Sequence, residues 1–334
     1  MKLLVTGGAG FIGSNFIHHI LQEHPQWEIT NLDKLTYAGN LENLKDIENN
    51  ARYRFVKGDI TDIKLISSLL KDGIDTIVNF AAESHVDRSI LDASPFIETN
   101  IKGTQTLLEG ARQWKVGRFI QVSTDEVYGS IGEDKFTEDS PLSPNSPYAA
   151  SKAAADLLCH AYWKTYQLPV IITRCSNNLG PFQFPEKLIP LAVTNALEDM
   201  PIPIYGDGLN VRDWIYVADH CRALELVLQK GEPGKVYNVA ASQEKTNLEL
   251  IHRLLDVMDK PKSLMKFVAD RLGHDRRYAL DANKLTRELG WVPEYSFEEA
   301  LTITVNWYLN NEPWWRKIKS GEYFKYYETM YSNK

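Results

Sequence analysis

The sequence predicts a doubly wound α/β fold, in which helices cover both faces of a parallel sheet. Short apolar segments alternate with longer helical segments along the first half of the chain. Several of the short segments are apolar on both faces, as strands are when helices cover both sides of a parallel sheet. A glycine-rich turn also joins the first short segment to the first helical one. Together these features indicate repeated β–α units.

The strands are predicted from short segments rich in apolar and β-branched residues. They lie at residues 2–6, 28–32, 53–57, 76–80, 118–123 and 170–174, and residues 236–240 resemble a further short strand of the sheet. The helices are predicted from longer segments with apolar residues at helical spacing. They lie at residues 11–23, 63–71, 95–114, 148–166, 247–259, 282–289 and 297–309.

The character of the chain changes after residue 175, where Pro and Gly become frequent and the predicted strands become short. We interpret residues 1–175 as a Rossmann domain, to which later sheet elements near residues 210–240 are added. Residues 176–334 are then mostly a smaller C-terminal substrate-binding lobe, interleaved with the first domain. A chain of this length is long enough to bury a core in both parts.

Composition excludes several classes of protein. The chain has 334 residues, of which 43% are hydrophobic and 24% charged, as in an ordinary soluble enzyme. A formal net charge of −7 argues against a nucleic-acid partner. The chain contains no run of about 18 apolar residues, so no membrane span is expected. Cys159, Cys175 and Cys221 are scattered, so neither a disulfide framework nor a metal site is expected, and a reducing cytoplasm fits.

The glycine-rich turn predicts a dinucleotide site. Gly7, Gly10 and Gly13 let the backbone approach a pyrophosphate, which would lie at the N-terminus of the helix that follows. Asp33 ends the second strand about 20 residues later, where its carboxylate would bind a ribose 2′-OH and repel a 2′-phosphate. NAD is therefore favoured over NADP, although Lys34 next to Asp33 weakens that preference. A strand–turn–helix that merely contains an extra glycine is the alternative.

Two further strand ends should reach the same crevice, because ligands bind outside the carboxyl ends of parallel strands. Asp59 and Ile60 follow the third strand, and Phe80, Ala81 and Ala82 follow the fourth. The small Ala81 and Ala82 side chains would let a ribose or pyrophosphate approach the backbone. Tight packing of the sheet explains these small residues equally well.

Tyr148 and Lys152 are four residues apart, so on a helix they share a face. The positive charge of Lys152 would lower the pKa of Tyr148 from its ordinary value of about 10. Tyr148 could then accept the proton of a sugar hydroxyl while a hydride leaves for a nicotinamide. A surface Tyr/Lys pair is the alternative, and the glycine turn earlier in the chain favours the catalytic interpretation.

Thr124, Asp125 and Glu126 follow the fifth predicted strand, so they should lie at its carboxyl end and face the cleft. Thr124 could hydrogen-bond the hydroxyl that is oxidised. Two adjacent carboxylates could supply an acid and a base, because like charges disfavour double ionisation. The sequence does not say which carboxylate has the raised pKa. A strand-terminating turn with two solvated acids is the alternative for this segment taken alone.

The glycine turn, S-T-D-E-V-Y-G at 123–129 and Y-A-A-S-K at 148–152 together resemble the extended short-chain dehydrogenase/reductases of the nucleotide-sugar type. Within that family the chain is most similar to the dTDP-glucose 4,6-dehydratases, and the similarity runs nearly from end to end. Related epimerases and decarboxylases share the glycines and the Tyr/Lys pair but typically lack the acid pair. Two positions depart from the pattern on the substrate side, because Leu179 replaces an aromatic residue and Leu272 replaces a proline.

The resemblance implies a tightly bound NAD that is regenerated in every turnover. It implies that Tyr148, with Lys152 and Thr124, takes the C4 hydroxyl proton, that Glu126 removes the C5 proton and that Asp125 protonates the departing C6 hydroxyl. The product would be a 4-keto-6-deoxy sugar nucleotide for deoxysugar synthesis, with rhamnose as the expected end product. Cofactor contacts are implied at Gly7, Gly10, Phe11, Ile12, Gly13, Asp33, Lys34, Leu35, Thr36, Asp59, Ile60, Phe80, Ala81, Ala82, Ser84, Thr99, Tyr148, Lys152 and Asn178.

Substrate contacts are implied at Ser84, Thr124, Asn177, Lys187, Leu188, Pro203, Tyr205, Arg212, Asn247, Arg271 and His274. Arg212 and Arg271 have a physical reason to bind a diphosphate, since guanidinium forks match phosphate oxygens. An interdomain ion pair is the alternative for either arginine, and packing is the alternative for Tyr205 and His274.

The resemblance also implies a homodimer that pairs residues 95–114 and 148–166 with their copies in a helix bundle, to which Tyr162 and Trp163 could contribute. No metal, nucleic acid or membrane is expected to take part. The alternatives are a UDP-sugar 4-epimerase, a 4,6-dehydratase for another nucleotide-hexose, and a non-catalytic NAD-sensing protein. The intact catalytic residues argue against the last of these.

Overall fold

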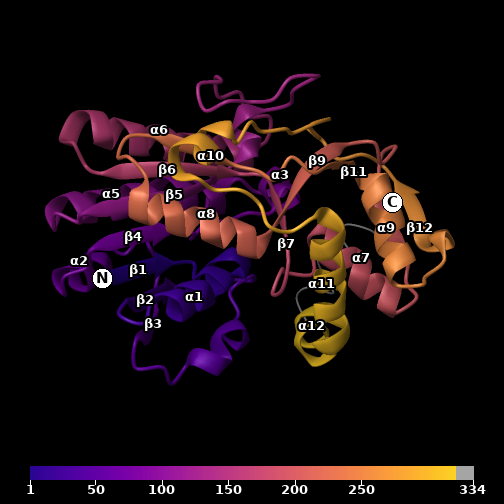
Figure 1. The fold of residues 1–334 in the computed structure, drawn as a ribbon, viewed down its shortest axis with the longest axis horizontal. Helices are drawn as coiled ribbons and strands as arrows, with labels where there is room; N and C mark the ends of the chain where they lie inside the picture. The colour runs from indigo at the N-terminus through magenta and orange to yellow at the C-terminus, as the bar shows by residue number, and fades with distance from the viewer. Residues whose placement is uncertain (321–334) are drawn as a thin grey trace.

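A computed structural model describes residues 1–320 of the chain. It contains an α/β body and, beside it, a smaller group of short sheets and helices formed by the later part of the chain (Figure 1). The final residues of the proposed 176–334 lobe lie outside the described residues. The division into two lobes at residue 175 stays a prediction.

Seven parallel strands form the central sheet, in the order β10-β6-β5-β4-β1-β2-β3. Their bounds are β1 (Lys2–Thr6), β2 (Glu28–Asp33), β3 (Tyr53–Lys57), β4 (Thr76–Asn79), β5 (Arg118–Thr124), β6 (Val170–Cys175) and β10 (Val236–Val239). The predicted strand at 236–240 therefore extends the main sheet, next to β6. The strand order reverses between β1 and β4, and such a switch point opens a crevice at the carboxyl ends of the strands.

Helices cover both faces of this sheet, which confirms the predicted fold class. Leu3 and Val5 of β1 belong to one core with helices α1 (Phe11–Glu23) and α8 (Val217–Lys230). Leu4, which points to the other face because side chains alternate along a strand, belongs to a second core. That core is covered by α2 (Ile63–Lys71), α5 (Thr104–Gln113) and α6 (Pro147–Tyr166).

The helix predicted from 95 to 114 runs without a break from residue 94 to 113, but its middle part is π-helical. α4 (Ser94–Phe96) leads into a π-helical turn, η2 (Ile97–Gly103), and then into α5. Asn100 of the π turn bonds both backbone groups of Glu83 and donates to the hydroxyl of Ser151 on α6. A π turn holds an extra residue that hydrophobic periodicity does not register, and such turns are frequent at functional sites.

The later part of the chain forms two small sheets with their own helices. One sheet has the order β11-β9-β7, and the other pairs β12 with β8. Their bounds are β7 (Asn177–Leu179), β8 (Ile202–Tyr205), β9 (Val211–Tyr216), β11 (Glu244–Thr246) and β12 (Met265–Val268). The helices are α7 (Leu188–Leu197), α9 (Asn247–Val257), α10 (Asn283–Leu289), α11 (Phe297–Asn310) and α12 (Glu312–Lys319). Short elements elsewhere are η1 (Leu41–Ile47), α3 (Val86–Leu91), η3 (Asp125–Tyr128) and η4 (Lys262–Leu264).

Helices α7 and α8 had no counterpart among the predicted elements. The frequent prolines of this region indicated short strands, but Pro190 lies in the first turn of α7, where a missing backbone N–H does no harm. Over residues 1–320, no helix has both the length and the apolar character needed to cross a membrane.

Candidate active site

A cavity of about 340 Å³ opens at the carboxyl ends of the central strands and extends toward β7 and the start of α7. The predicted cofactor residues that line it are Gly7, Gly10, Phe11, Ile12, Gly13, Asp33, Lys34, Thr36, Asp59, Ile60, Phe80, Ala81, Ala82, Ser84, Thr99, Tyr148, Lys152 and Asn178. The predicted catalytic and substrate residues that line it are Thr124, Glu126, Asn177, Lys187 and Leu188. The remaining predicted residues lie elsewhere: Leu35, Asp125, Pro203, Tyr205, Arg212, Asn247, Arg271 and His274.

The glycine turn lies against the fourth strand end so closely that a side chain would not fit. Gly7 has a φ of +69°, and a Cβ built on it would lie 2.6 Å from the backbone nitrogen of Ala81. A Cβ on Gly13 would lie 2.5 Å from the carbonyl oxygen of Gly7. The turn therefore requires glycine at both positions, and its backbone is open to a pyrophosphate at the start of α1.

Asp33 is buried where β2 ends, and its carboxylate organises the same turn. Oδ2 accepts a hydrogen bond from the backbone nitrogen of Ala9 at 2.9 Å, and Oδ1 accepts one from Leu35 at 2.8 Å. Leu35 thus acts through its backbone rather than by lining the cavity. Lys34, the residue that weakened the preference for NAD, pairs with Asp59 at 2.7 Å. Its charge is partly neutralised there, so Asp33 stays the residue predicted to discriminate against a 2′-phosphate.

Tyr148 and Lys152 lie on the buried face of α6, which begins at Pro147 after the cap residue Ser146. The ammonium of Lys152 donates to the carbonyl oxygen of Val122 at 2.7 Å. Burial, and then the carboxylates of Glu126 and Asp125 among other groups, raises the pKa of Tyr148 well above 10. This direction is opposite to the expected effect of Lys152, because low polarity and negative charge outweigh one ammonium that bonds elsewhere.

Thr124 ends β5 and caps the short helix η3, which carries both carboxyl groups. Its Oγ1 accepts from the backbone nitrogen of Glu126 at 3.3 Å and donates to Oδ1 of Asp125 at 3.1 Å. The two acids project differently from this turn, since Glu126 lines the cavity and Asp125 does not. Asp125 is instead 2% exposed, and its Oδ2 is buried with no hydrogen-bond partner.

The surroundings of the two acids differ in charge. Burial, followed by the charge of Glu126, raises the pKa of Asp125 from 3.8 to about 8. Burial also raises the pKa of Glu126, but the charges of Arg271, Lys187 and Arg212 oppose that rise. A pKa of about 8 lets Asp125 keep a proton at neutral pH, although the charge of Arg212 opposes the rise; at Glu126, Arg271 and Lys187 oppose it in addition. The two protons belong to a coupled pair.

The predicted substrate residues outside the cavity all lie in the later part of the chain, between residues 203 and 274. Arg212 is buried on β9, where it donates to the backbone oxygen of Asp275 at 2.9 Å. The rings of Tyr205 and His274 meet edge to face at 6.1 Å. Burial, followed by the charge of Arg271, lowers the pKa of His274.

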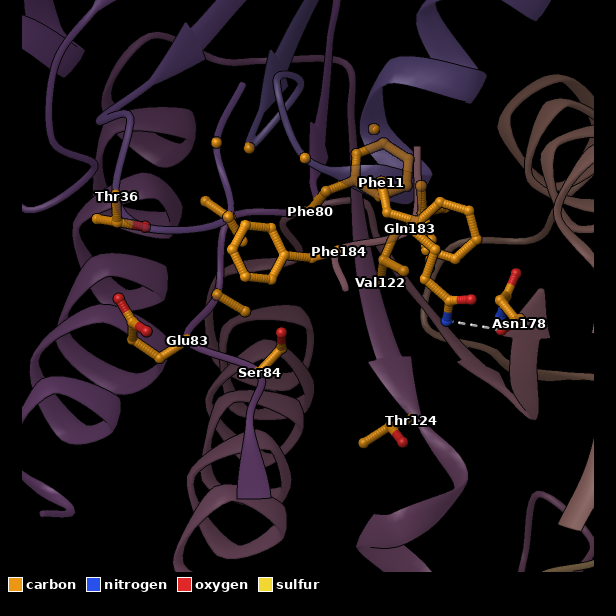
Figure 2. Close-up of a pocket in the computed structure, with 18 of the residues that line it drawn as sticks. Phe11, Thr36, Phe80, Glu83, Ser84, Val122, Thr124, Asn178, Gln183 and Phe184 are labelled. Atoms are coloured by element: carbon orange, nitrogen blue, oxygen red, sulfur yellow. Dashed lines mark hydrogen bonds between the residues drawn. The ribbon is translucent and has the colours of Figure 1, made fainter. Parts of the chain in front are cut away.

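Several cavity residues escaped the sequence analysis. Figure 2 shows Phe184 and Gln183 among the lining residues, with Gln183 donating to the backbone oxygen of Asn178 at 3.0 Å. The ring of Phe184 meets that of Tyr37 edge to face at 5.4 Å. Glu186, also in the lining, pairs with Arg88 at 3.3 Å. The aromatic and acidic residues directly before Lys187 were the available signal for this segment.

Among the residues that the structure describes, no group of three or more His, Cys, Asp and Glu side chains is arranged to hold a metal ion. The three cysteines are buried and free.

Comparison with known proteins adds to this geometry. A family model described as GDP-mannose 4,6 dehydratase matches residues 4–304. A curated dTDP-glucose 4,6-dehydratase from Xanthomonas campestris is 51% identical over 340 residues, which covers 96% of this chain and 96% of that protein.

Solved structures of related enzymes are also similar to this chain. The crystal structure of a dTDP-glucose 4,6-dehydratase from Streptomyces venezuelae, with NAD bound, has a TM-score of 0.94 and 55% sequence identity, and the match covers 96% of this chain and 100% of that one. A UDP-glucuronic acid 4-epimerase from Bacillus cereus, also with NAD, has a TM-score of 0.88 at 30% identity, with 93% and 99% of the two chains covered. The fold is thus shared between dehydratases and epimerases, and the identity is higher to the dehydratase.

Proposed function

The chain belongs to the family described by the GDP-mannose 4,6 dehydratase model, and we propose that it is an NAD-dependent dTDP-glucose 4,6-dehydratase. It would convert dTDP-glucose into dTDP-4-keto-6-deoxyglucose by oxidation at C4, loss of water across C5 and C6, and reduction at C6. The observation that carries this proposal is the divided environment of the acid pair. A neutral Asp125 beside a Glu126 surrounded by cations supplies an acid and a base to one substrate.

The residues of the cavity fit NAD. The glycine turn leaves room for a pyrophosphate where any Cβ would collide with Ala81. Asp33 lies at the end of β2 in the lining, with Lys34 paired to Asp59, so a ribose with a free 2′-OH is preferred. Tyr148 and Lys152 line the far end of the same cavity. These residues would hold NAD, and the chemistry that it would supply is hydride transfer from C4 and back to C6.

Tyr148 takes the proton of the C4 hydroxyl in the first step. Thr124 is placed to hydrogen-bond the same hydroxyl, because Thr124 and Tyr148 both line the cavity. Lys152 holds α6 against β5 through the carbonyl of Val122 and keeps a positive charge behind the phenol. The 4-keto group that results makes the C5 hydrogen acidic.

Glu126 removes the C5 proton in the second step, and Asp125 donates its proton to the departing C6 hydroxyl. The raised pKa of Asp125 keeps that proton available at neutral pH. The cations around Glu126 stabilise its ionised form. Return of a proton to C5 by Glu126 then accompanies reduction at C6 and restores Glu126. The proton that Tyr148 took from the C4 hydroxyl must then replace the one that Asp125 gave to the departing water, which closes the cycle.

The UDP-sugar 4-epimerase alternative uses the same fold and the same Tyr/Lys pair. An epimerase needs no acid beside the C6 hydroxyl, because it loses no water. A protonated Asp125 next to Thr124 would then serve no purpose while its burial still lowers stability. The acid pair therefore favours the dehydratase over the epimerase.

The proposal extends to the oligomeric state and the cellular setting of the enzyme. We expect a homodimer through α5 and α6, where the apolar side chain of Leu157 on α6 is 60% exposed. The two residues first named for this role make contacts within the chain, since Tyr162 donates to Glu109 and Trp163 packs beside Gly234. We further propose a cytoplasmic enzyme of deoxysugar synthesis, with rhamnose as the end product.

The purified protein tests the proposal when it is given dTDP-, UDP-, CDP- and GDP-glucose in parallel. A 4-keto-6-deoxy product is recognised by its absorbance in alkali. We expect product from dTDP-glucose at the highest kcat/KM. Preference for another nucleotide would reassign the substrate, and C4 inversion without the keto product would reassign the reaction.

A further inference from the structure

A buried carboxylate outside the proposed catalytic set joins the two parts of the molecule beside the substrate site. Asp87, in the first turn of α3, is 5% exposed. Its Oδ2 accepts a hydrogen bond of 3.1 Å from the hydroxyl of Tyr205, and its Oδ1 lies 3.6 Å from Nη1 of Arg271. Tyr205 ends β8, and Arg271 follows the paired strand β12. One carboxylate of the α/β body therefore holds two neighbouring segments of the second lobe.

The contacts of Arg271 leave one edge of its guanidinium group without a hydrogen-bond partner. Nη1 faces Asp87, whereas Nε is buried and makes no hydrogen bond. A buried N–H without an acceptor is costly. A phosphate oxygen is the acceptor that suits this edge, because guanidinium groups bind phosphates through charge-assisted, often paired, hydrogen bonds.

The charge of Arg271 also acts on Glu126. It opposes the raised pKa of Glu126 most strongly, ahead of Lys187 and Arg212. The fixed charge of Asp87 keeps the guanidinium on the side of Tyr205, where the second lobe supplies the walls of the substrate site.

We propose that Asp87 is a positioning residue for the diphosphate of the substrate. It holds Nη1 of Arg271 so that the Nε edge meets a phosphate oxygen. The hydroxyl of Tyr205 fixes the other oxygen of the carboxylate and so its orientation. This inference rests on the proposed function, since the diphosphate is taken to be that of a nucleotide sugar.

A double-mutant cycle on dTDP binding tests the inference. Titration calorimetry gives the Kd of dTDP for the wild type, Asp87→Asn, Arg271→Lys and the double variant, each checked for bound NAD and for melting temperature. Asp87→Asn should raise the Kd about 10-fold, as expected for loss of a charge-assisted contact. In the Arg271→Lys background, which has no Nε edge to orient, the same change should raise it less than about 2-fold. KM for the sugar nucleotide should rise with the Kd.

Tyr205→Phe provides a second variant if Asp87→Asn does not fold. It removes only the hydroxyl that holds Oδ2, so it should raise the Kd about 3-fold in the wild-type background and leave it unchanged beside Arg271→Lys. Equal effects in the two backgrounds, for either variant, would overturn the inference. A wild-type protein that fails to bind dTDP would instead overturn the proposed nucleotide. A wild type that binds dTDP as tightly as Asp87→Asn does would reject only the role of Asp87.

Discussion

The hydroxyl of Thr124 donates to Oδ1 of Asp125 at 3.1 Å and leaves Oδ2 of the same carboxyl group buried without a partner. A buried oxygen of this kind is the natural place for a proton, because a protonated oxygen carries no charge that burial would penalise. Thr124 thus has two roles. It hydrogen-bonds Asp125, and it faces the cavity in which the C4 hydroxyl is expected. The turn after β5 connects the oxidation site with the acid that completes the elimination.

Replacement of Asp125 by Asn should separate oxidation from water loss. Asn has nearly the same shape but no proton to give, so we expect elimination to slow by at least about 100-fold, the usual worth of general acid catalysis. Oxidation at C4 should continue, so NADH should accumulate after mixing with substrate. Stopped-flow absorbance measures the accumulation. The exposed acid Asp139, changed to Asn, is the matched control, and an unchanged elimination rate in Asp125→Asn would remove Asp125 from the mechanism.

The same substitution should change how stability depends on pH. The pKa of Asp125 is raised from 3.8 to about 8, so the folded protein keeps a proton that the unfolded chain loses. The stability that this proton contributes is complete below the unfolded pKa and falls as pH rises through the folded pKa. Asn has no such loss. The free energy of unfolding of Asp125→Asn, relative to that of the wild type, should therefore rise between pH 5 and pH 8 by at least about 1.4 kcal/mol, the value of one pKa unit. Denaturant unfolding at both pH values measures it, and a gain that shrinks toward pH 8 would contradict the assignment.

Removal of the phenol hydroxyl should abolish the first step. Tyr148→Phe keeps the ring that packs against Phe96 but cannot accept the C4 proton. We expect the transient NADH signal to fall at least about 100-fold in rate, while bound NAD is retained. Tyr162→Phe on the same helix serves as control. A full-sized NADH transient at the normal rate in Tyr148→Phe would show that another group is the base.

The cofactor turn should tolerate no side chain at its first glycine. Gly7→Ala places a Cβ 2.6 Å from the backbone of Ala81 at a φ of +69°, so we expect either loss of bound NAD or a clear fall in melting temperature. Gly132→Ala is the matched control, since a Cβ there has nothing within 4 Å. Cofactor content after gel filtration, read by absorbance, checks the prediction. Equal NAD content and equal stability in the two variants would show that the turn is less constrained than its geometry indicates.

Patterns within short segments were enough to predict those site residues that a single strand end or helix start puts in place. Asp33 was expected at the end of a strand because an apolar segment stops there, and the structure ends β2 at that residue. The start of α6 at Ser146 and Pro147 follows from the same kind of signal. The π turn at Asn100 was not predictable, because its purpose is to reach Glu83 and Ser151, which only the folded chain brings near.

Contacts between distant segments explain the rest. The pKa shifts of the two acids depend on burial and on Arg271, Lys187 and Arg212, which come from segments far from Asp125 in the sequence. The bridge from Asp87 to Tyr205 and Arg271 likewise joins α3 to two later segments. Sequence patterns identify such residues only as single polar positions, whereas their chemistry comes from the partners that folding supplies.

Deuterium at C5 of the product formed from dTDP-glucose in D₂O tests the central claim that the acid pair makes this enzyme a dehydratase. Mass spectrometry and NMR should find a 4-keto product that lacks the C6 hydroxyl and carries solvent deuterium at C5. Glu126→Gln should incorporate that deuterium at least about 100-fold more slowly, and Glu133→Gln, an exposed acid in the next loop, should match the wild type. A product that keeps its C6 hydroxyl, is inverted at C4 and carries no deuterium at C5 would contradict the claim.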